Sequence, residues 1–558
     1  MTLPQSSFCL HAKYKSFWLL SLLFLAVSQL HAQTACEQLT GIRLANAKIT
    51  SAALVPAMDL PSQPAPHAFP GAHVPEHCEV KAVATPTSDS EIHFELWLPP
   101  ASAWNGKYLQ VGSGGWGGVI AIHSMITPLN RGYATAATDD GHVADGTGKF
   151  TMGHPEKLID FGYRAIHYTS LESRVIMNAF YAQPLKQAYF VGCSDGGREA
   201  LMQAERFPED FNGIVAGAPA NHWTHQFSGF IWNERALFAK GESILPATKL
   251  ELLQSAVLKQ CDALDGVRDG IIDDPRKCHF DPSILLCKAG DNPDCLTGEQ
   301  AEAVRKIYSG PKDSVTGEQI YPGFEPGMEA ETSSWRVWLL NRVQADFGNS
   351  NFADAVYENP KWDWRTSSLH DDLELADKKE ASIVNSYNPD LRTFRDHGGK
   401  LIVYQGWEDA AVAPRDAINF YNQVTEFLTQ YPDPRASSSN GSIDGFYRLF
   451  MAPGVSHCTG GVGPSSFGNY ALPTAGVPDD ADHDVVLALD RWVISGEAPD
   501  YIIATQVLGR ESEASGSAGP LMTRPLCPYP KFARYKGTGS TADAKNFECV
   551  TEKAVSKR

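Results

Sequence analysis

The stretch Val191–Arg198, with the sequence VGCSDGGR, limits the possible folds of this chain more than any other. Gln187–Val191 leads into it and predicts a short buried strand, while Glu199–Ala204 follows it and predicts the first turns of a helix. A G-x-S-x-G sequence between a strand and a helix predicts a strained turn whose serine hydroxyl projects into a cleft, because small neighbours let strand and helix approach each other. The helix N-terminus behind this turn favours negative charge that develops there.

Two residues far along the chain could complete a catalytic set with Ser194. Asp409 follows the predicted strand Lys400–Tyr404, and His457 follows the predicted strand Tyr447–Met451. On its own, G-x-S-x-G could be a glycine-rich turn with an incidental serine. The order Ser, Asp, His, with each residue just after a strand, is that of an α/β-hydrolase. We therefore expect Ser194 to be the nucleophile, His457 the general base, and Asp409 the carboxylate that orients the imidazole.

Two other carboxylates, Glu408 and Asp416, are rivals to Asp409 for this role. The sequence interpretation favours a solvated surface charge for each of them. The chain has 17 His residues, so position after a strand, not residue type, is what singles out His457.

A glycine-rich loop, Gly112–Gly118, follows the predicted strand Lys107–Val111. In the α/β-hydrolase fold the loop after this early strand supplies one main-chain N–H that holds a substrate oxygen. Glycines at this place let the N–H reach the substrate without an intervening side chain. The alternative is a flexible loop without a role in the chemistry.

The length of 558 residues and the hydrophobic content of 43% allow a large core, and exceed what one plain hydrolase domain needs. The alternation of strands and helices stops near Pro219 and resumes at Lys400, and the chain between is helical, aromatic and cysteine-bearing. We expect an α/β-hydrolase fold with a large, mainly helical lid domain inserted. The predicted boundaries are 1–32 for a signal peptide, 33–219 and 391–558 for the two parts of the hydrolase domain, and 220–390 for the lid.

The N-terminal segment predicts export. Lys13 and Lys15 precede the apolar run Phe17–Val27, and small residues follow with a cleavage site after Ala32. An uncleaved membrane anchor is the alternative, although the run is short for a span. We expect a secreted or periplasmic protein without a membrane partner after cleavage. A net charge of −18 argues against nucleic acid and anionic membranes as partners.

Eleven cysteines are present, and all but Cys9 lie outside the predicted signal peptide, which leaves an even number for disulfides in an exported protein. Cys193 directly precedes Ser194, and Cys458 directly follows His457. If the serine and the histidine meet, these two cysteines come within bonding distance. Such a bridge would fasten nucleophile to base and stabilise the fold by about 5 kcal/mol at most in the chain-entropy view.

These features together resemble the tannase and feruloyl esterase family of α/β-hydrolases, which includes mono(2-hydroxyethyl) terephthalate hydrolase. The resemblance rests on the Cys-Ser-x-Gly-Gly-Arg elbow, on the Cys-Ser, Asp and His-Cys arrangement, and on the C-terminal segment Thr523–Pro530, and it covers nearly the whole mature chain. It implies ester hydrolysis, a Cys193–Cys458 disulfide, a lid domain, and oxyanion N–H groups from Asp195 and Gly115. Sequence alone leaves the other cysteine pairings open. Resemblance suggests Cys36–Cys78, Cys261–Cys278, Cys287–Cys295 and Cys527–Cys549.

The lid segment Cys261–Asp274 contains carboxylates separated by glycines, which suits a hard cation such as calcium, although the closing Glu of an EF-hand is missing. The resemblance implies a structural Ca²⁺ that is bound far from the ester. Its ligands would be the side chains of Asp262, Asp265 and Asp269 and the main-chain oxygens of Val267 and Ile271. The alternative is an acidic turn stapled by Cys261–Cys278.

Resemblance also implies a small aromatic ester as substrate, with a hydroxycinnamoyl or galloyl acyl part. Tannase, chlorogenate esterase and mono(2-hydroxyethyl) terephthalate hydrolase activity stay open within this class, as does a serine peptidase of the same fold. An inactive hydrolase scaffold used for binding is the alternative from another class. Lid aromatics could stack a phenolic ring, although most are expected in the core: Phe230, Trp232, Trp335, Trp338, Trp362 and Trp364. The sequence indicates neither the natural ester nor the oligomeric state.

Overall fold

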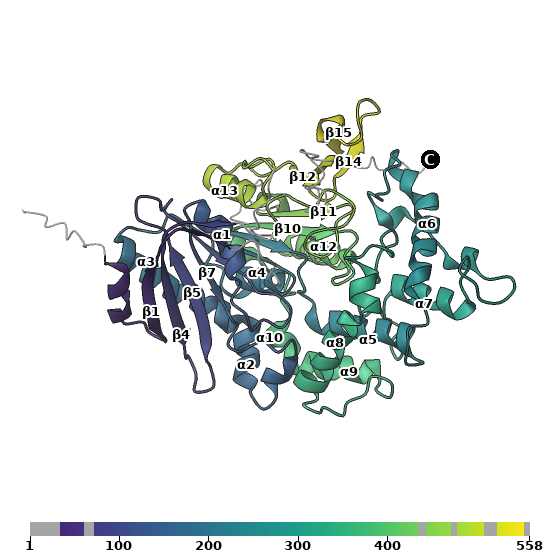
Figure 1. Cartoon of the computed structure of the whole chain (residues 1–558), viewed down its shortest axis with the longest axis horizontal. Coiled ribbons are helices and arrows are strands. Elements are labelled where there is room, and N and C mark those ends of the chain that lie inside the picture. The colour runs from purple at the N-terminus through teal and green to yellow at the C-terminus, as the bar shows by residue number, and fades with distance from the viewer. Residues whose placement is uncertain (1–33, 61–71, 433–441, 470–476, 507–521, 552–558) are drawn as a thin grey trace, which may run out of the picture.

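A nine-stranded mixed sheet runs through the molecule (Figure 1). The computed structural model describes residues 34–60, 72–432, 442–469, 477–506 and 522–551, so the predicted signal peptide 1–32 lies outside the described residues. The strand order is β1-β4-β5-β7-β6-β8-β9-β10-β11. The strands are β1 (Ala47–Val55), β4 (His77–Ala84), β5 (Ile92–Leu98), β6 (Lys107–Val111), β7 (Ala134–Thr138), β8 (Gln187–Cys193), β9 (Gly213–Gly217), β10 (Lys400–Gly406) and β11 (Tyr447–Ala452).

The N-terminal part of the sheet is antiparallel and the rest is parallel. β1, β4, β5 and β7 pair antiparallel, whereas β7, β6, β8, β9, β10 and β11 pair parallel. Parallel strands are covered on both faces, so they carry near-continuous apolar runs, and β8 is buried from Ala188 to Cys193. The carboxyl ends of the parallel strands meet at one edge, where β8, β10 and β11 each lead into a predicted catalytic residue.

Two hydrophobic cores lie on the two faces of the sheet. Side chains of β8 alternate between them, since Ala188 and Phe190 face one core while Tyr189 and Val191 face the other. The first core includes helices α3 (Ala165–Tyr181), α4 (Asp195–Arg206), α11 (Arg392–Asp396) and α12 (Pro414–Gln430). The second includes α1 (Ile122–Asn130) and α13 (Val485–Ser495).

Between β9 and β10 the described chain leaves the sheet and forms a helical region with its own core. In Figure 1 this region lies beside and below the parallel half of the sheet, in teal and green. Trp116 and Phe161 from the hydrolase side join its core, so the two parts share one packed boundary. Its helices are α5 (Trp223–Phe238), α6 (Leu250–Cys261), α7 (Gly298–Ser309), α8 (Val343–Ser350), α9 (Leu369–Ala376) and α10 (Ser382–Val384).

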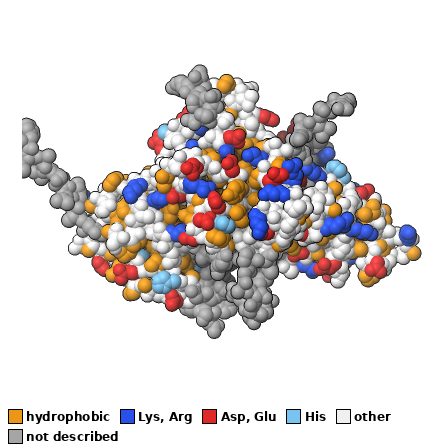
Figure 2. Space-filling model, turned by 90° about the horizontal axis from the view of Figure 1, so that it is seen from above, with side chains coloured by type: hydrophobic (Ala, Val, Ile, Leu, Met, Phe, Trp, Pro, Cys, Tyr) orange, Lys and Arg blue, Asp and Glu red, His pale blue; other side chains and the backbone are white. Residues whose placement is uncertain are grey.

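The remaining elements are small. β12 (Ile502–Gln506) pairs with β13 (Met522–Leu526), and β14 (Phe532–Tyr535) pairs with β15 (Phe547–Val550) near the C-terminus. β2 (Met58–Asp59) pairs with β3 (His73–Val74), and the short helix α2 (Pro155–Ile159) precedes α3. On the face in Figure 2, Lys and Arg side chains are interspersed with Asp and Glu. In the described residues, none of the helices combines the length and the apolar character that a membrane crossing requires.

The fold class is the predicted one: an α/β-hydrolase sheet with flanking helices and a large helical region between β9 and β10. A side-chain cap sets the start of α13 at Val485, because the Asp484 side chain accepts hydrogen bonds from the N–H groups of Val486 and Leu487 at 2.8 and 3.0 Å. The elbow helix begins at Asp195, directly after the serine.

Candidate active site

Ser194 occupies a strained turn at the end of β8. Its φ of 65° and ψ of −122° lie outside the regions that L-residues favour, as a residue projected from an elbow requires. Glycine is needed on either side: a Cβ on Gly192 would lie 2.3 Å from the carbonyl oxygen of Gly196, and one on Gly197 would lie 2.3 Å from that of Gly217. Strand β8 and helix α4 therefore approach as closely as the sequence predicts.

The three predicted catalytic side chains form one hydrogen-bonded chain. His457 Nε2 lies 2.8 Å from Ser194 Oγ, and His457 Nδ1 lies 2.8 Å from Asp409 Oδ2. Asp409 is fixed in turn, since its Oδ1 accepts the N–H groups of Ala411 at 2.7 Å and Val412 at 2.9 Å. With Nδ1–H donated to the carboxylate, Nε2 is left to accept the serine proton, which is the geometry that general-base activation needs.

The two rival carboxylates have different surroundings. Glu408 and Asp416 are buried rather than solvated, so the expectation of surface charges is wrong. Asp416 accepts a hydrogen bond from the Tyr387 hydroxyl at 3.0 Å. Burial raises the pKa of Glu408 well above its usual range. Asp409 is the one whose carboxylate bonds His457.

Cys193 and Cys458 are joined in a disulfide, with their Cα atoms 5.9 Å apart. The link ties the residue before Ser194 to the residue after His457, as predicted. The other four predicted pairs are also present: Cys36–Cys78, Cys261–Cys278, Cys287–Cys295 and Cys527–Cys549.

A cavity of about 470 Å³ opens over Ser194 and His457. One wall is helix α5, which contributes Trp223, Phe227 and Phe230. The ring of Trp338 stands edge-on to the His457 imidazole, with 5.0 Å between centroids. Among the described residues that line the cavity none is Lys or Arg, and its polar side chains include Gln226 and Thr459. The cavity therefore suits a flat apolar group next to the serine.

The predicted set of lid aromatics divides in two. Phe230 and Trp338 line the cavity, whereas Trp335 and Trp364 are buried in the core of the helical region, and Trp232 and Trp362 are partly buried against it. The prediction missed Trp223, Phe227 and Phe347, which also line the cavity. The spacing of residues 223, 227 and 230 at i, i+4 and i+7 was the available signal, since it places all three on one face of a helix.

Asp195 and Gly115 both line the cavity together with Ser194. Gly115 has a φ of +62°, which favours glycine, and Asp195 is the first residue of α4. The glycine loop is joined to the elbow by a hydrogen bond from the N–H of Gly196 to the carbonyl of Ser113 at 3.1 Å. The two predicted oxyanion residues are thus on adjoining segments beside the serine.

The predicted calcium loop forms a tight acidic turn in the helical region, closed by the Cys261–Cys278 bridge. Asp262 Oδ1 accepts the N–H of Gly270 at 3.0 Å, and Asp265 Oδ1 accepts the N–H of Val267 at 2.8 Å. Burial, together with the charges of Asp269 and Asp262, raises the pKa of Asp265 to about 6. The Arg524 guanidinium donates to Asp269 Oδ2 at 2.7 Å and so offsets part of this negative charge. Carboxylate oxygens on a left-handed glycine turn are the type of ligand that a hard cation prefers.

A second group of acidic side chains is packed more closely than those of the predicted calcium loop. Within the described ranges, only Asp140, Asp195 and Glu199 form a group of three His, Cys, Asp or Glu side chains with ligand atoms within 4.8 Å of one another. They lie behind the elbow and not in the predicted calcium loop. Of the three, only Asp195 was predicted as a site residue, and for its main-chain N–H rather than for its carboxylate.

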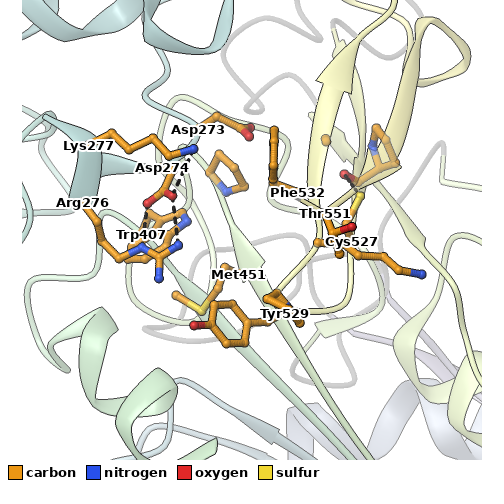
Figure 3. A pocket seen from close by; sticks show the side chains of 15 residues that line it. Asp273, Asp274, Arg276, Lys277, Trp407, Met451, Cys527, Tyr529, Phe532 and Thr551 are labelled. Carbon is orange, nitrogen blue, oxygen red and sulfur yellow. Dashed lines mark hydrogen bonds and ion pairs between the residues drawn. The ribbon is translucent and has the colours of Figure 1, made fainter. Parts of the chain in front are cut away.

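A further hollow of about 290 Å³ lies between the C-terminal segment and the turn with Asp274 and Arg276 (Figure 3). The Arg276 guanidinium donates to both Asp274 oxygens, at 2.7 and 2.9 Å, and lies 5.3 Å from the centre of the Trp407 ring. Its charge is thus compensated locally. Neither Ser194 nor His457 lines this hollow.

Known proteins resemble the chain over nearly its full length. An uncharacterized esterase of Xanthomonas campestris pv. campestris is 39% identical over 536 residues, 93% of this chain and 92% of the relative. A probable feruloyl esterase B-1 of Aspergillus fumigatus is 33% identical over 85% of this chain and 86% of the relative. The crystal structure of feruloyl esterase B from Aspergillus oryzae superposes with a TM-score of 0.81 at 30% identity, covering 92% of this chain and 99% of that one.

A more distant structure, tannin acyl hydrolase from Aspergillus niger, has a TM-score of 0.70 at 23% identity over 90% of this chain and 92% of that one, and so supports the fold. The family model described as tannase and feruloyl esterase matches residues 78–550. With a nucleophile elbow, a Ser–His–Asp chain and this match, the chain belongs to the tannase and feruloyl esterase family and is a carboxylic ester hydrolase.

Proposed function

We propose that this protein is a serine esterase for phenolic esters, in which Ser194 attacks the ester carbonyl while His457 takes its proton. The main-chain N–H groups of Asp195 and Gly115 hold the oxyanion of the tetrahedral intermediate. His457 then protonates the leaving alcohol and afterwards activates the water that releases the acid, while Asp409 keeps the imidazole oriented throughout. The observation that carries this proposal is the hydrogen-bonded chain of two 2.8 Å contacts, whose serine and histidine line an aromatic cavity.

The cavity supports an aromatic acyl group of the feruloyl or galloyl kind. A ring placed among Trp223, Phe227 and Phe230 would be desolvated on several sides, which favours a flat apolar group. A terephthalate half-ester would bring a free carboxylate into the same space. Because no described Lys or Arg lines the cavity, that charge would be left unpaired, which costs on the order of 1–3 kcal/mol or more.

The test compares three esters on the purified protein: methyl ferulate, methyl gallate and mono(2-hydroxyethyl) terephthalate. We expect kcat/KM to be highest for one of the two phenolic esters and at least about 10-fold lower for the half-ester, the factor that 1.4 kcal/mol produces. The Ser194→Ala variant, shown to be folded by its unfolding curve, serves as the blank. If all three esters are inert while p-nitrophenyl acetate is hydrolysed, the phenolic assignment is refuted.

A binding scaffold without catalysis is the alternative from another class. A serine-directed fluorophosphonate separates the two functions, because labelling requires an activated hydroxyl. We expect stoichiometric labelling of wild type and none of Ser194→Ala or His457→Ala. Folded wild-type protein that resists the reagent would favour the scaffold.

The helical region, residues 220–390, is proposed as a lid that supplies the acyl pocket. Within it Ca²⁺ would be held by the side chains of Asp262, Asp265 and Asp269 and by the main-chain oxygens of Val267 and Ile271. The ion would act as a structural crosslink and take no part in the chemistry. Calorimetric titration of chelator-treated protein with Ca²⁺, with Asp265→Asn as the control, tests this site.

Export to the periplasm or the medium is likewise proposed. Five disulfides form in oxidising compartments and support it. Mass spectrometry of the mature N-terminus would place the cleavage; a mature chain that begins at Met1 would refute a cleaved signal.

A further inference from the structure

Three carboxylates are packed together directly behind the proposed oxyanion donors. Asp140 follows β7, and Asp195 and Glu199 are on α4; all three are almost completely buried, with exposed fractions of 0, 1 and 0%. Their ligand atoms lie within 4.8 Å of one another. The guanidinium of Arg198 bonds Asp195 at 2.5 Å and is itself buried. One cation therefore faces three acidic groups, and full ionisation would leave an excess of two negative charges.

Ser113 connects this cluster to the glycine loop. Its N–H donates to Glu199 Oε2 at 2.9 Å, and its hydroxyl lies 2.9 Å from Glu199 Oε1 and 3.1 Å from Asp195 Oδ2. Ser113 is two residues before Gly115, the proposed donor on this loop, and Asp195 is the donor on the elbow. Glu199 thus holds, through one serine, the two segments that must stay in register for the oxyanion to be bound.

Asp140 is the carboxylate of this cluster whose negative charge is not compensated. Its φ is 60°, and neither of its carboxylate oxygens has a hydrogen-bond partner of normal geometry in the described part of the chain. Ser113 and Glu199 are the side chains close enough to affect it through hydrogen bonding. Carboxylate oxygens within 4.8 Å of one another repel, unless one of them carries a proton.

The space around the pair suits a proton better than a metal ion. A Cβ on Gly117 would lie 2.4 Å from Asp140 Oδ2, and one on Gly112 would lie 2.7 Å from Glu199 Oε2, so main chain packs directly on these oxygens. A hard cation requires six or more oxygen ligands. The other titratable or charged groups that act on this pair or lie beside it are Asp139, His142, Lys157, Asp160, Asp195 and Arg198.

We propose that Asp140 and Glu199 share a proton, and that Glu199, as a positioning residue, uses this singly protonated pair, which carries one negative charge instead of two, to hold Ser113 and with it both oxyanion donors. The inference deepens the proposed esterase mechanism and rests on it. Loss of the shared proton would place a further negative charge behind the site where the oxyanion develops. Turnover would then fall for an electrostatic reason, without loss of substrate binding.

The direction of the pKa shifts agrees with this arrangement. Burial, and then the charge of Asp195, raises the pKa of Glu199 to about 7, while burial and the charges of Glu199 and Asp195 raise that of Asp140 well above its usual range. A carboxyl group with a raised pKa binds its proton more tightly in the folded state. Its contribution to stability is therefore complete below its ordinary pKa and is lost as the pH rises through about 7.

Two substitutions at Glu199 separate positioning from packing. Glu199→Ala removes both bonds to Ser113, and we expect kcat for p-nitrophenyl acetate to fall about 100-fold with KM changed less than about 2-fold, as loss of an oxyanion donor does. Glu199→Gln keeps the shape and is permanently neutral, so its kcat should be at least about 10-fold higher than that of Glu199→Ala. The ratio of the wild-type kcat to that of Glu199→Gln should fall between pH 6 and 8, because the general base is the same in both proteins. If the two variants are equally impaired, or if the pH profile of Glu199→Gln matches wild type, the proposal is overturned.

A stability measurement tests the shared proton without reference to activity. The urea midpoint of wild type should fall between pH 5 and 8 by more than that of Glu199→Gln. Glu329→Gln is the matched control, because Glu329 is a fully buried carboxyl group with a raised pKa that bonds Tyr308 in the helical region. The Glu329→Gln variant should also show a smaller change of the urea midpoint with pH, but its kcat and the pH profile of its kcat should equal those of wild type. If wild type hydrolyses no ester, the proposed function fails, yet this comparison still decides whether the proton is shared.

Elemental analysis distinguishes the proton from a cation. Wild type and Asp140→Asn, dialysed side by side, should contain equal amounts of metal per chain. A stoichiometric loss in Asp140→Asn, with Asp265→Asn as the control for the calcium loop, would show a bound cation at this cluster and overturn the proposal.

Discussion

Replacing Cys193 and Cys458 together by alanine should lower both stability and turnover, and the two losses have separate physical origins. Cys193 is fully buried and its sulfur is bonded to that of Cys458. Alanine at both positions keeps the small volume and removes the covalent link. The link spans a sequence separation of 265, whereas the Cys287–Cys295 bridge spans only 8. This shorter bridge makes a matched control in the same chain.

The chain-entropy relation gives the expected sizes. For a separation of 265 it yields about 5.5 kcal/mol at 25 °C, slightly above the value of about 5 kcal/mol expected from the sequence, and for a separation of 8 about 2.5 kcal/mol, a difference of about 3 kcal/mol. The effect on turnover follows from position. His457 and Ser194 are each adjacent to a bridged cysteine, and their contact is 2.8 Å. A displacement of about 1 Å in such a pair costs about 100-fold in kcat.

The assay combines urea unfolding, followed by tryptophan fluorescence, with kcat for p-nitrophenyl acetate at 25 °C. Cys193→Ala/Cys458→Ala should lose more stability than Cys287→Ala/Cys295→Ala and about 100-fold in kcat, while the control keeps wild-type turnover. The reasoning is refuted if the long-loop variant retains kcat within about 2-fold of wild type. Equal stability losses for the two variants would refute the entropic account alone.

Other outcomes can be checked with single substitutions. Asp409→Asn should lower kcat about 10⁴-fold by favouring the wrong His457 tautomer, whereas Glu408→Gln should stay within about 10-fold of wild type; equal losses would contradict the assignment of the carboxylate. Chelator should lower the melting temperature of wild type without altering turnover at 25 °C, and should have no effect on Asp265→Asn; an unshifted wild-type melting curve would remove the calcium proposal. Trp338→Ala should reduce kcat/KM for methyl ferulate more than for p-nitrophenyl acetate, since only methyl ferulate carries an aromatic ring in its acyl part; equal reductions would place Trp338 outside the acyl pocket.

The catalytic chain was predictable because its signals are local. Ser194 lies in a short motif with a steric reason for each glycine, and Asp409 and His457 each follow a strand whose apolar run is legible in the sequence. The neighbouring cysteines added a distance constraint across the chain. Together these features fixed which strands must end at the same edge of the sheet.

Other parts of the site depend on packing between distant segments. Glu408 and Asp416 were expected in solvent because a carboxylate is rarely buried, and only the fold shows what surrounds them. Phe347 reaches the cavity from a helix far from the elbow in sequence. The Asp140–Glu199 cluster joins the end of β7 to α4, and no spacing rule connects two such positions.

Strands β9 and β10 lie side by side in parallel register, with Gly213 opposite Lys400 and Gly217 opposite Tyr404, although residues 218–399 intervene. The whole helical region therefore enters and leaves the hydrolase scaffold at two neighbouring points. Such an attachment would let mutation, shuffling or grafting change the proposed acyl pocket while the Ser–His–Asp chain is inherited intact. For engineering, the junction of residues 217–218 and 399–400 is where the proposed lid could be exchanged between homologues as one piece.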